Sequence, residues 1–386
     1  MNYLNCLNNV TDFEKSKEIL QNKHLIIKNY DEINLYLVKY DKSKCDMSDS
    51  DVKKCRGLIL EKNTNKLICI PPLKSEDSSA LEGIEDLSGY IVEDFPDGTM
   101  INVFKYKNKL MISTRSNIGA NCKYYSDKTF RLLFEESIDD ETYTQLGNIN
   151  EGITLSFVLQ HPENIIVSKY SKPSLVLVHV CFVEENKIYF KSIEETHKYL
   201  ESIDLHFKTP YIYRLKTIEE CHKKIQKMGK YEQGLVIKYI HNETYKRYKI
   251  RNDYYNYVRD LKGNSNNKKY LYLELKKYNG LEEYLKYYPE DITLFESYRI
   301  ELYNSTHNLF NFYQDCFVRK DRDGNRKKII KDVDYEYRPL CIDLHNIYKN
   351  DRIKTDKRKV IYYMNTLPSA KVLFVLNYKN YSKNKN

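Results

Sequence analysis

The sequence predicts an α+β fold in which a domain of antiparallel sheet over residues 1–262 is followed by an all-α domain over residues 268–386. A chain of 386 residues is long enough for two domains. Short strand-like segments separated by turn residues follow one another in the first part of the chain, which is typical of hairpins and meanders. After the polar cluster at 263–267 apolar residues recur at helical spacing instead, so this cluster is the expected linker.

The first domain is expected to begin with a helix and then to consist mainly of short strands. Apolar residues alternate along the early strand candidates, which lie at 25–30, 33–40, 55–62, 65–72, 89–95, 99–106 and 109–116. Helices are predicted at 127–136, 194–200 and 217–228. Further strands are predicted at 152–159, in a pair over 174–193 that turns at Glu185-Asn186, and at 234–240 and 247–251.

The second domain is expected to contain helices separated by a few clear breaks. Pro289 and Asp291 mark one break, and the segment 321–325 reads as a loop. From Lys349 to Asn386 the chain carries ten Lys or Arg against two Asp. A basic tail of this kind suits a phosphate-rich partner because each neutralised phosphate releases counterions. A solvated, partly disordered end would have the same composition.

The composition excludes several classes of protein. No apolar run approaches the roughly 18 residues of a membrane span, and the N-terminus lacks the pattern of a secretory signal. The nine cysteines form no CxxC pair, so we expect reduced thiols and a cytoplasmic protein, in a host cytoplasm or a virion. The 37 tyrosines accompany abundant Lys, Asn and Ile, which indicates an AT-rich genome and does not by itself indicate base stacking.

Five short polar patches occur at strand ends and turns of the first domain, where side chains from different strands can converge on one cleft. In chain order they are Lys54-Cys55-Arg56-Gly57, Phe95-Pro96-Asp97-Gly98, Thr114-Arg115-Ser116, Ser156-Phe157-Val158-Leu159 and Gln233-Gly234-Leu235-Val236, and Lys249-Ile250-Arg251 closes the series. Each patch alone has an ordinary structural explanation, such as a turn for Asp97-Gly98 or an exposed strand face for Lys249 and Arg251. Their order and spacing together carry the argument.

This series resembles the RNA ligases of the bacteriophage type, within the covalent nucleotidyltransferases that include polynucleotide ligases and mRNA capping enzymes. The resemblance covers about Lys54 to Tyr255 and implies an ATP-grasp-like nucleotidyltransferase domain. The segments CRGLILE and YKIRNDYY match the first and last motifs of that family closely. The resemblance implies roles in binding nucleotide or phosphate for Arg56, Asp97, Gly98, Arg115, Glu232, Lys249 and Arg251.

The chain departs from the family at three positions that carry chemistry. The family's Lys-x-Asp-Gly motif supplies the lysine that attacks the α-phosphate of ATP, and here the lysine position is Phe95. Phe95 has no lone pair with which to form a bond to phosphorus. Two acidic positions that hold ribose and Mg²⁺ in the family fall on Val158 and Gln233. Glu232 is one place away, but neighbouring strand residues point to opposite faces, so Gln233 is the expected cleft position.

Four lysines near the motif are candidates to replace the nucleophile, namely Lys54, Lys74, Lys105 and Lys109. We expect each of them to be an ordinary surface lysine. A metal site is not expected from side chains either, because His161 has no cysteine and no evident carboxylate partner.

Three functional hypotheses follow. The first is a viral-type, RNA-ligase-like pseudoenzyme that binds nucleotide or RNA ends through a basic cleft and is catalytically impaired. The second is an active RNA ligase that uses a non-standard lysine and requires ATP, Mg²⁺ and a 5′-phosphate. The third is a structural or assembly protein that retains only the fold. No membrane partner is expected, and the sequence leaves the oligomeric state and the identity of the RNA open.

Overall fold

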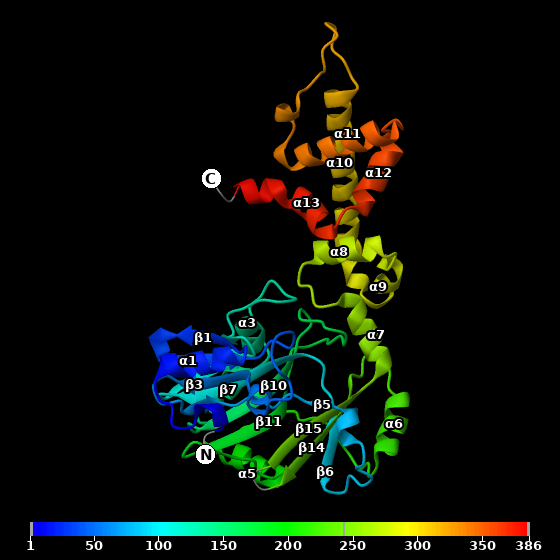
Figure 1. Cartoon of the computed structure of the whole chain (residues 1–386). Coiled ribbons are helices and arrows are strands. Elements are labelled where there is room, and N and C mark those ends of the chain that lie inside the picture. The colour runs from blue at the N-terminus through cyan, green and yellow to red at the C-terminus, as the bar shows by residue number, and fades with distance from the viewer. Residues whose placement is uncertain (1–2, 242–243, 384–386) are drawn as a thin grey trace. The chain divides into compact units, whose positions relative to one another are not determined.

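The computed structural model describes residues 3–241 and 244–383. The chain divides into two compact units, Met1–Arg259 and Asp260–Asn386 (Figure 1). The division lies three residues before the end expected for the first domain at residue 262. None of the helices in the described residues combines the length and the apolar character that a membrane crossing needs.

The first unit is built on three sheets, in which all pairs are antiparallel except the short pair β15–β5. The first sheet has the order β1 (Ile26–Tyr30), β2 (Leu35–Lys39), β3 (Arg56–Glu61) and β4 (Leu67–Cys69). The second has the order β12 (Lys187–Tyr189), β11 (Ser174–Glu184), β10 (Ile153–Gln160), β7 (Thr99–Tyr106), β8 (Lys109–Thr114) and β9 (Asn117–Ile118). The third has the order β13 (Ile212–Tyr213), β6 (Tyr90–Asp94), β14 (Gly234–His241), β15 (Thr244–Arg251) and β5 (Glu76–Asp77).

Short helices accompany these sheets. They are α1 (Phe13–Asn22), α2 (Ser50–Lys54), α3 (Phe130–Glu135), α4 (Asp140–Leu146), α5 (Ile193–Ser202) and α6 (Ile218–Gln226), and α7 (Asp253–Lys262) crosses the boundary between the units. Most begin with an Asp, Ser or Thr whose side chain accepts a backbone N–H of the first turn, for example Thr217 from Glu220 in α6.

The third sheet buries one face of β14 and β15 in an apolar core and carries a row of basic residues on the other face of β15. Leu235 and Ile250 are buried in a core that includes Cys221 of α6. Because side chains alternate along a strand, Lys249 and Arg251 lie on the opposite face of β15. Figure 1 shows α6 beside these strands.

The second sheet has apolar side chains on both faces of β10. Leu155, Phe157 and Leu159 of β10 belong to a large core of the unit, together with apolar residues of α3, α4 and α5. Val158 lies on the other face, where it packs with Val176, Val178 and Met100 in a small apolar cluster.

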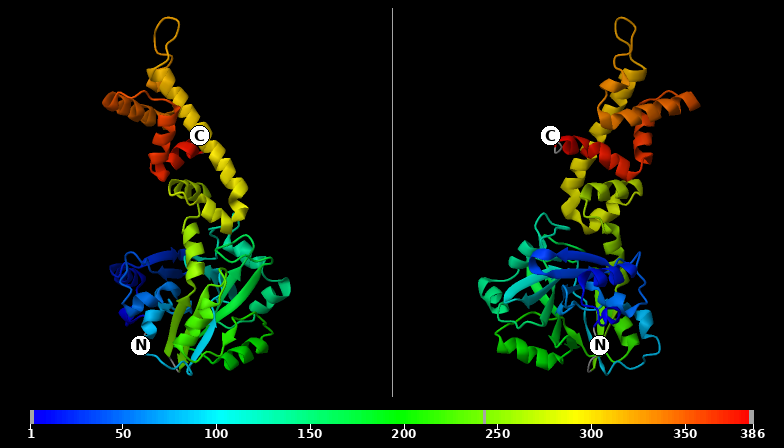
Figure 2. Two further views of the ribbon diagram at one scale, coloured as in Figure 1. Left: turned by 90° about the vertical axis from the view of Figure 1, so that its right-hand side faces the viewer. Right: turned by 60° about the vertical axis from the view of Figure 1, so that its left-hand side comes forward.

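The second unit is helical, as predicted. It contains α8 (Lys268–Lys277), α9 (Leu281–Tyr287), α10 (Ile292–Phe317), α11 (Arg338–Asp351), α12 (Lys357–Thr366) and α13 (Ser369–Lys383). Figure 2 shows α10 as the longest helix of this unit, with the others arranged along it. The basic segment from Lys349 is largely helical, and two of its lysines are paired within the unit, Lys359 with Asp351 and Lys371 with Asp343.

The predicted α+β class with a helical C-terminal part is confirmed, and the predicted strands of the first domain are present. The sequence did not predict the short elements α2, α4, β5, β9 and β13, nor α7, which occupies the residues just before the expected linker. The break expected at Pro289 lies between α9 and α10. In the expected loop at 321–325, the backbone N–H of Asp321 donates to the carbonyl of Asn325 at 2.9 Å.

Candidate functional site

A pocket of about 220 Å³ in the first unit gathers residues from all three sheets and their connections. We call it the cationic pocket, because seven of its lining residues are Lys42, Arg56, Lys74, Arg115, Arg247, Lys249 and Arg251. The remaining lining residues are Tyr40, Ser75, Phe95, Pro96, Gly98, Met100, Val158, Val178 and Gln233. None of these described residues is acidic.

Strand β15 supplies three of the cations. Arg247, Lys249 and Arg251 are two residues apart, so they share one face of the strand. The Nζ of Lys249 lies 2.8 Å from the exposed carboxylate of Asp77 and 3.4 Å from the carbonyl of Ser75. This arrangement holds the Lys249 amine at the wall of the pocket.

Arg56 and Arg115 are brought together by the close approach of two strand ends. Gly57 has a φ of +94°, and a Cβ there would lie 2.9 Å from the backbone of Arg115, so only glycine fits. The Arg115 guanidinium lies over the Tyr40 ring at 4.5 Å and donates to the Tyr40 carbonyl at 2.7 Å. The arginine of the Arg-Gly motif is thereby placed beside a second arginine.

Phe95 stands directly after β6, and cations flank its ring. The guanidinium of Arg251 lies 5.1 Å and that of Arg247 lies 5.7 Å from the ring centroid, which are cation–π distances. The backbone N–H of Phe95 donates to the carbonyl of Gly234 at 3.0 Å. The aromatic ring therefore occupies the wall of the pocket at the position of the expected lysine.

Two glycines fix the backbone on either side of this position. Gly98 has a φ of +146°, and a Cβ there would lie 2.3 Å from the Leu159 carbonyl oxygen. Gly234 has a φ of +131°, and a Cβ there would lie 2.2 Å from the Ile250 carbonyl oxygen. Neither position tolerates a side chain without backbone movement.

Gln233 bridges the strand end of β6 and the basic face of β15. With its amide oriented to satisfy both ends, it donates to the Pro96 carbonyl at 3.0 Å and accepts from Nη1 of Arg251 at 2.9 Å. Phe95, Val158 and Gln233, which the motifs align with the nucleophile and the acidic residues of the ligases, therefore line one pocket.

Burial and the repulsion between neighbouring cations lower the pKa of two of these residues, Arg56 and Lys42. Burial, followed by the neighbouring Arg247, lowers the pKa of Arg56 to about 10. Burial and then Lys249 and Lys74 lower the pKa of Lys42 below its ordinary value. A negative charge in the pocket would act in the opposite direction and raise the pKa of both groups.

Two of the predicted binding residues, Asp97 and Glu232, lie outside the lining of the cationic pocket. The Asp97 carboxylate accepts from the backbone N–H groups of Val167 at 3.1 Å and Ser168 at 2.8 Å, and from the Tyr255 hydroxyl at 2.7 Å. Glu232 accepts from the backbone N–H of Gly229 at 2.6 Å. Both carboxylates thus accept hydrogen bonds from neighbouring protein groups.

Of the four candidate lysines, one lines the cationic pocket and three do not. Lys74 lines the cationic pocket, which corrects the expectation of an ordinary surface residue. The Lys54 amine donates to the Tyr3 carbonyl at 2.7 Å, the Lys105 amine donates to the Gly147 carbonyl at 2.8 Å, and Lys109 is exposed on β8. These three do not line the pocket.

A larger cavity of about 670 Å³ adjoins the cationic pocket and shares Phe95, Pro96 and Gln233 with it. We call it the tyrosine pocket, because Tyr170, Tyr211, Tyr213 and Tyr231 line it. The charge of its lining is opposite in sign to that of the cationic pocket. Among its described lining residues are three acidic ones, Asp94, Asp97 and Glu232, and one cation, Lys208. Tyr211 and Tyr231 are 64% and 40% exposed, so their rings are accessible.

A buried ion pair lies on the same face of the third sheet as the basic residues. The Nζ of Lys238 is 2.5 Å from the Glu93 carboxylate and 2.8 Å from the Val178 carbonyl. Both side chains are less than a tenth exposed. In the register of β14 and β15, Arg247 lies opposite Lys238. The ion pair of Lys238 with Glu93 is therefore next to the row of basic residues on β15.

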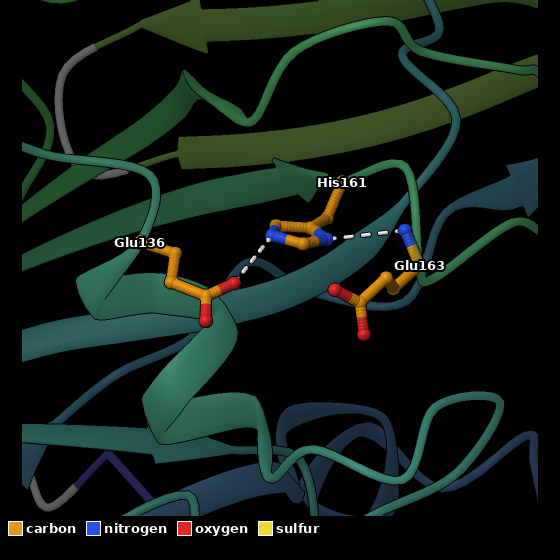
Figure 3. Close-up of side chains that lie close together, drawn as sticks. All are labelled: Glu136, His161 and Glu163. Atoms are coloured by element: carbon orange, nitrogen blue, oxygen red, sulfur yellow. Dashed lines mark hydrogen bonds and ion pairs between the residues drawn. The ribbon is translucent and has the colours of Figure 1, made fainter.

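Figure 3 shows another polar cluster, formed by Glu136, His161 and Glu163, with ligand atoms within 4.8 Å of one another. Its groups are already paired. Lys128 lies 2.9 Å from Glu136 and 2.6 Å from Glu163, and both ring nitrogens of His161 are engaged. The sequence reading missed the Glu136 partner of His161, because it lies 25 residues away on another element.

Sequence reasoning also missed Tyr40, Lys42 and Arg247 as pocket residues. Arg247 had a signal, because it continues the two-residue spacing of Lys249 and Arg251. Tyr40 and Lys42 follow β2 in a connection that no periodicity marks.

The first unit is thus an α+β domain of antiparallel sheets in which ligase-type motif positions converge on one basic pocket. The chain is 27% identical over 233 residues to a protein of Autographa californica nuclear polyhedrosis virus described as a putative bifunctional polynucleotide kinase/RNA ligase. The match covers 55% of this chain and 32% of that protein, so it spans about a third of the viral relative. This relative confirms the predicted resemblance to RNA ligases.

Two solved structures are also similar to the chain. One is a putative ATP-dependent DNA ligase from Aquifex aeolicus, with a TM-score of 0.43 and 19% identity over 78% of this chain and 80% of that one. The other is an archaeal ATP-dependent RNA ligase, with a TM-score of 0.46 and 12% identity over 76% of this chain and 72% of that one. No protein-family profile matches the chain.

Proposed function

We propose that the chain binds the phosphates of a nucleotide or an RNA end in the cationic pocket, without forming a covalent nucleotide adduct at position 95. The observation that carries the proposal is the pocket itself, which is lined by seven Lys and Arg side chains and by the Phe95 ring. Phosphate oxygens are strong acceptors for such cations, and arginine binds them with two parallel hydrogen bonds. The phenyl ring of Phe95 offers no electron pair to phosphorus.

The tyrosine pocket supports the assignment to a nucleotide or RNA. Aromatic rings bind nucleobases by stacking, and the acidic groups of this pocket disfavour phosphate. A nucleotide whose phosphates occupy the cationic pocket therefore has an adjoining cavity for its base, reached past Phe95.

A second candidate function has one observation in its favour. Lys42 and Lys74 line the cationic pocket, and the lowered pKa of Lys42 makes its neutral, nucleophilic form more accessible. On this reading the chain is an ATP-dependent RNA ligase that uses a lysine outside the usual motif.

Incubation of the protein with α-labelled ATP and Mg²⁺ separates the two candidates. We expect no acid-labile, base-stable protein–AMP adduct, because position 95 has no amine. Labelled RNA should still bind, with an affinity that falls as salt rises by a log–log slope of about −0.7 per phosphate contacted. An adduct that maps to Lys42 or Lys74 and disappears in Lys42→Arg or Lys74→Arg would establish the second candidate instead. Protein that binds neither ATP nor RNA would leave the scaffold hypothesis.

The role of the tyrosine pocket can be measured separately. The chain has no tryptophan, so Tyr211→Trp would introduce a single fluorophore at the rim of that pocket. We expect ATP and single-stranded RNA to quench its fluorescence by stacking, and inorganic triphosphate to leave it nearly unchanged. Tyr189→Trp, on the exposed strand β12, is the control. Equal responses of the two variants would show that no base enters the tyrosine pocket.

A further inference from the structure

The carboxylates around the cationic pocket are already used by protein groups. The Asp97 carboxylate accepts three hydrogen bonds, and Glu93 is paired with Lys238 at 2.5 Å. Asp94 accepts from the Tyr213 hydroxyl at 2.6 Å, and Asp77 is paired with Lys249 at 2.8 Å. Glu232 accepts from a backbone N–H and lines the tyrosine pocket. None of these described carboxylates is among the residues that line the cationic pocket.

This donor set is poorly suited to a divalent metal ion. Mg²⁺ requires oxygen ligands and is usually held in proteins by one or two carboxylates. The side-chain amide oxygen of Gln233 already accepts from Arg251. Seven positive side chains around a cavity of about 220 Å³ would also repel a doubly charged cation.

The same pocket contains buried donors that lack a partner. The Ser75 hydroxyl and the Arg115 Nε group are fully buried and form no hydrogen bond, although both residues line the cavity. Buried polar atoms are normally paired, so two unpaired donors on residues of the pocket lining are unusual.

The charge of the pocket indicates how many phosphates it takes. A phosphate monoester carries about −1.5 to −2 charges at neutral pH. With Lys249 paired to Asp77, the other six cations still exceed that charge several times, whereas a chain of two or three phosphates comes closer to neutralising them.

We infer that the cationic pocket binds an oligophosphate of two or three linked phosphates as a bare polyanion, so that Mg²⁺ competes with the protein for the phosphates. This inference rests on the proposed phosphate-binding function and specifies its ligand. A nucleoside triphosphate and a 5′-triphosphorylated RNA end share this chemistry.

Calorimetric titration with inorganic tripolyphosphate, ATP and a 5′-triphosphorylated oligonucleotide tests the inference. Each titration is made in EDTA and again in excess Mg²⁺. We expect binding in EDTA and an affinity about 10- to 100-fold weaker in Mg²⁺, since the metal removes at least one charge-assisted contact. Tighter binding of ATP or of the oligonucleotide than of tripolyphosphate would identify which source adds contacts outside the cationic pocket.

A restored carboxylate should reverse this dependence. Gln233→Glu places a negative charge in the pocket with little change of shape, so oligophosphate binding in EDTA should weaken and the penalty from Mg²⁺ should shrink. Gln226→Glu makes the same chemical change at the exposed end of α6 and is the matched control.

Two outcomes would overturn the inference. Oligophosphate binding that appears or tightens only with Mg²⁺ would show that the pocket uses a metal ion after all. Absence of binding in both buffers would remove the proposed phosphate-binding function together with the inference, which distinguishes the two failures.

Discussion

The double substitution of Lys249 and Arg251 by alanine is expected to weaken the binding of ATP or RNA by about 100-fold or more, since each charge-assisted hydrogen bond contributes about 1.5–3 kcal/mol. Both side chains lie on the basic face of β15 and line the cationic pocket. Isothermal titration or filter binding at fixed salt measures the change. The salt dependence should also become shallower, because fewer phosphates are neutralised.

Lys246→Ala is the control for this experiment. Lys246 is exposed on the same strand but lies one residue out of phase with the basic face, so its removal should leave affinity nearly unchanged. A double variant that melts like the wild type and still binds with full affinity would show that the ligand is held elsewhere, for example by the basic residues after Lys349.

Replacement of Glu93 by alanine is expected to destabilise the first unit by about 3–5 kcal/mol, because it leaves the buried Lys238 ammonium without its partner. Lys238 is less than a tenth exposed, and its remaining contact is one carbonyl at 2.8 Å. Urea unfolding followed by circular dichroism gives the free energy of unfolding. The double variant Glu93→Leu with Lys238→Met should recover most of the loss, since it removes both charges together.

The Glu93→Ala variant should also show a characteristic dependence on pH. Burial lowers the pKa of Lys238 even in the presence of Glu93. The folded state therefore releases the Lys238 proton at a lower pH than the unfolded state, and the free energy of unfolding should rise as pH increases towards the ordinary lysine value of 10.5. A variant that loses less than about 0.5 kcal/mol, as an exposed site would, contradicts the buried pairing.

Much of the fold was accessible from the sequence because the relevant signals are local. Alternation along YKIR identified the face of β15 that carries Lys249 and Arg251, and the loss of alternation after residue 263 identified the helical unit. The motif order also identified Phe95, Val158 and Gln233, which the structure brings to one pocket although 138 positions separate the first from the last.

Other parts of the site depend on contacts that leave no local trace. Glu93 and Lys238 form a pair only because β6 and β14 align in one particular register, with Glu93 opposite Val236. Asp97 was predicted to bind nucleotide from its motif, yet its carboxylate is occupied by the N–H groups of a distant loop. Lys42 reaches the pocket from the connection after β2, which carries no strand or helix periodicity. Such placements require the tertiary structure.

The glycines that flank Phe95 have a consequence for how this protein can change. Because Gly98 and Gly234 press against carbonyl oxygens of neighbouring strands, the main chain at residue 95 is anchored whatever side chain it carries. Substitutions at that one position can thus change the side chain that lies beside Arg247 and Arg251 without moving the strand ends around it. The backbone frame and the chemical character of residue 95 can therefore vary independently, which gives selection or protein engineering a single position at which to change the pocket.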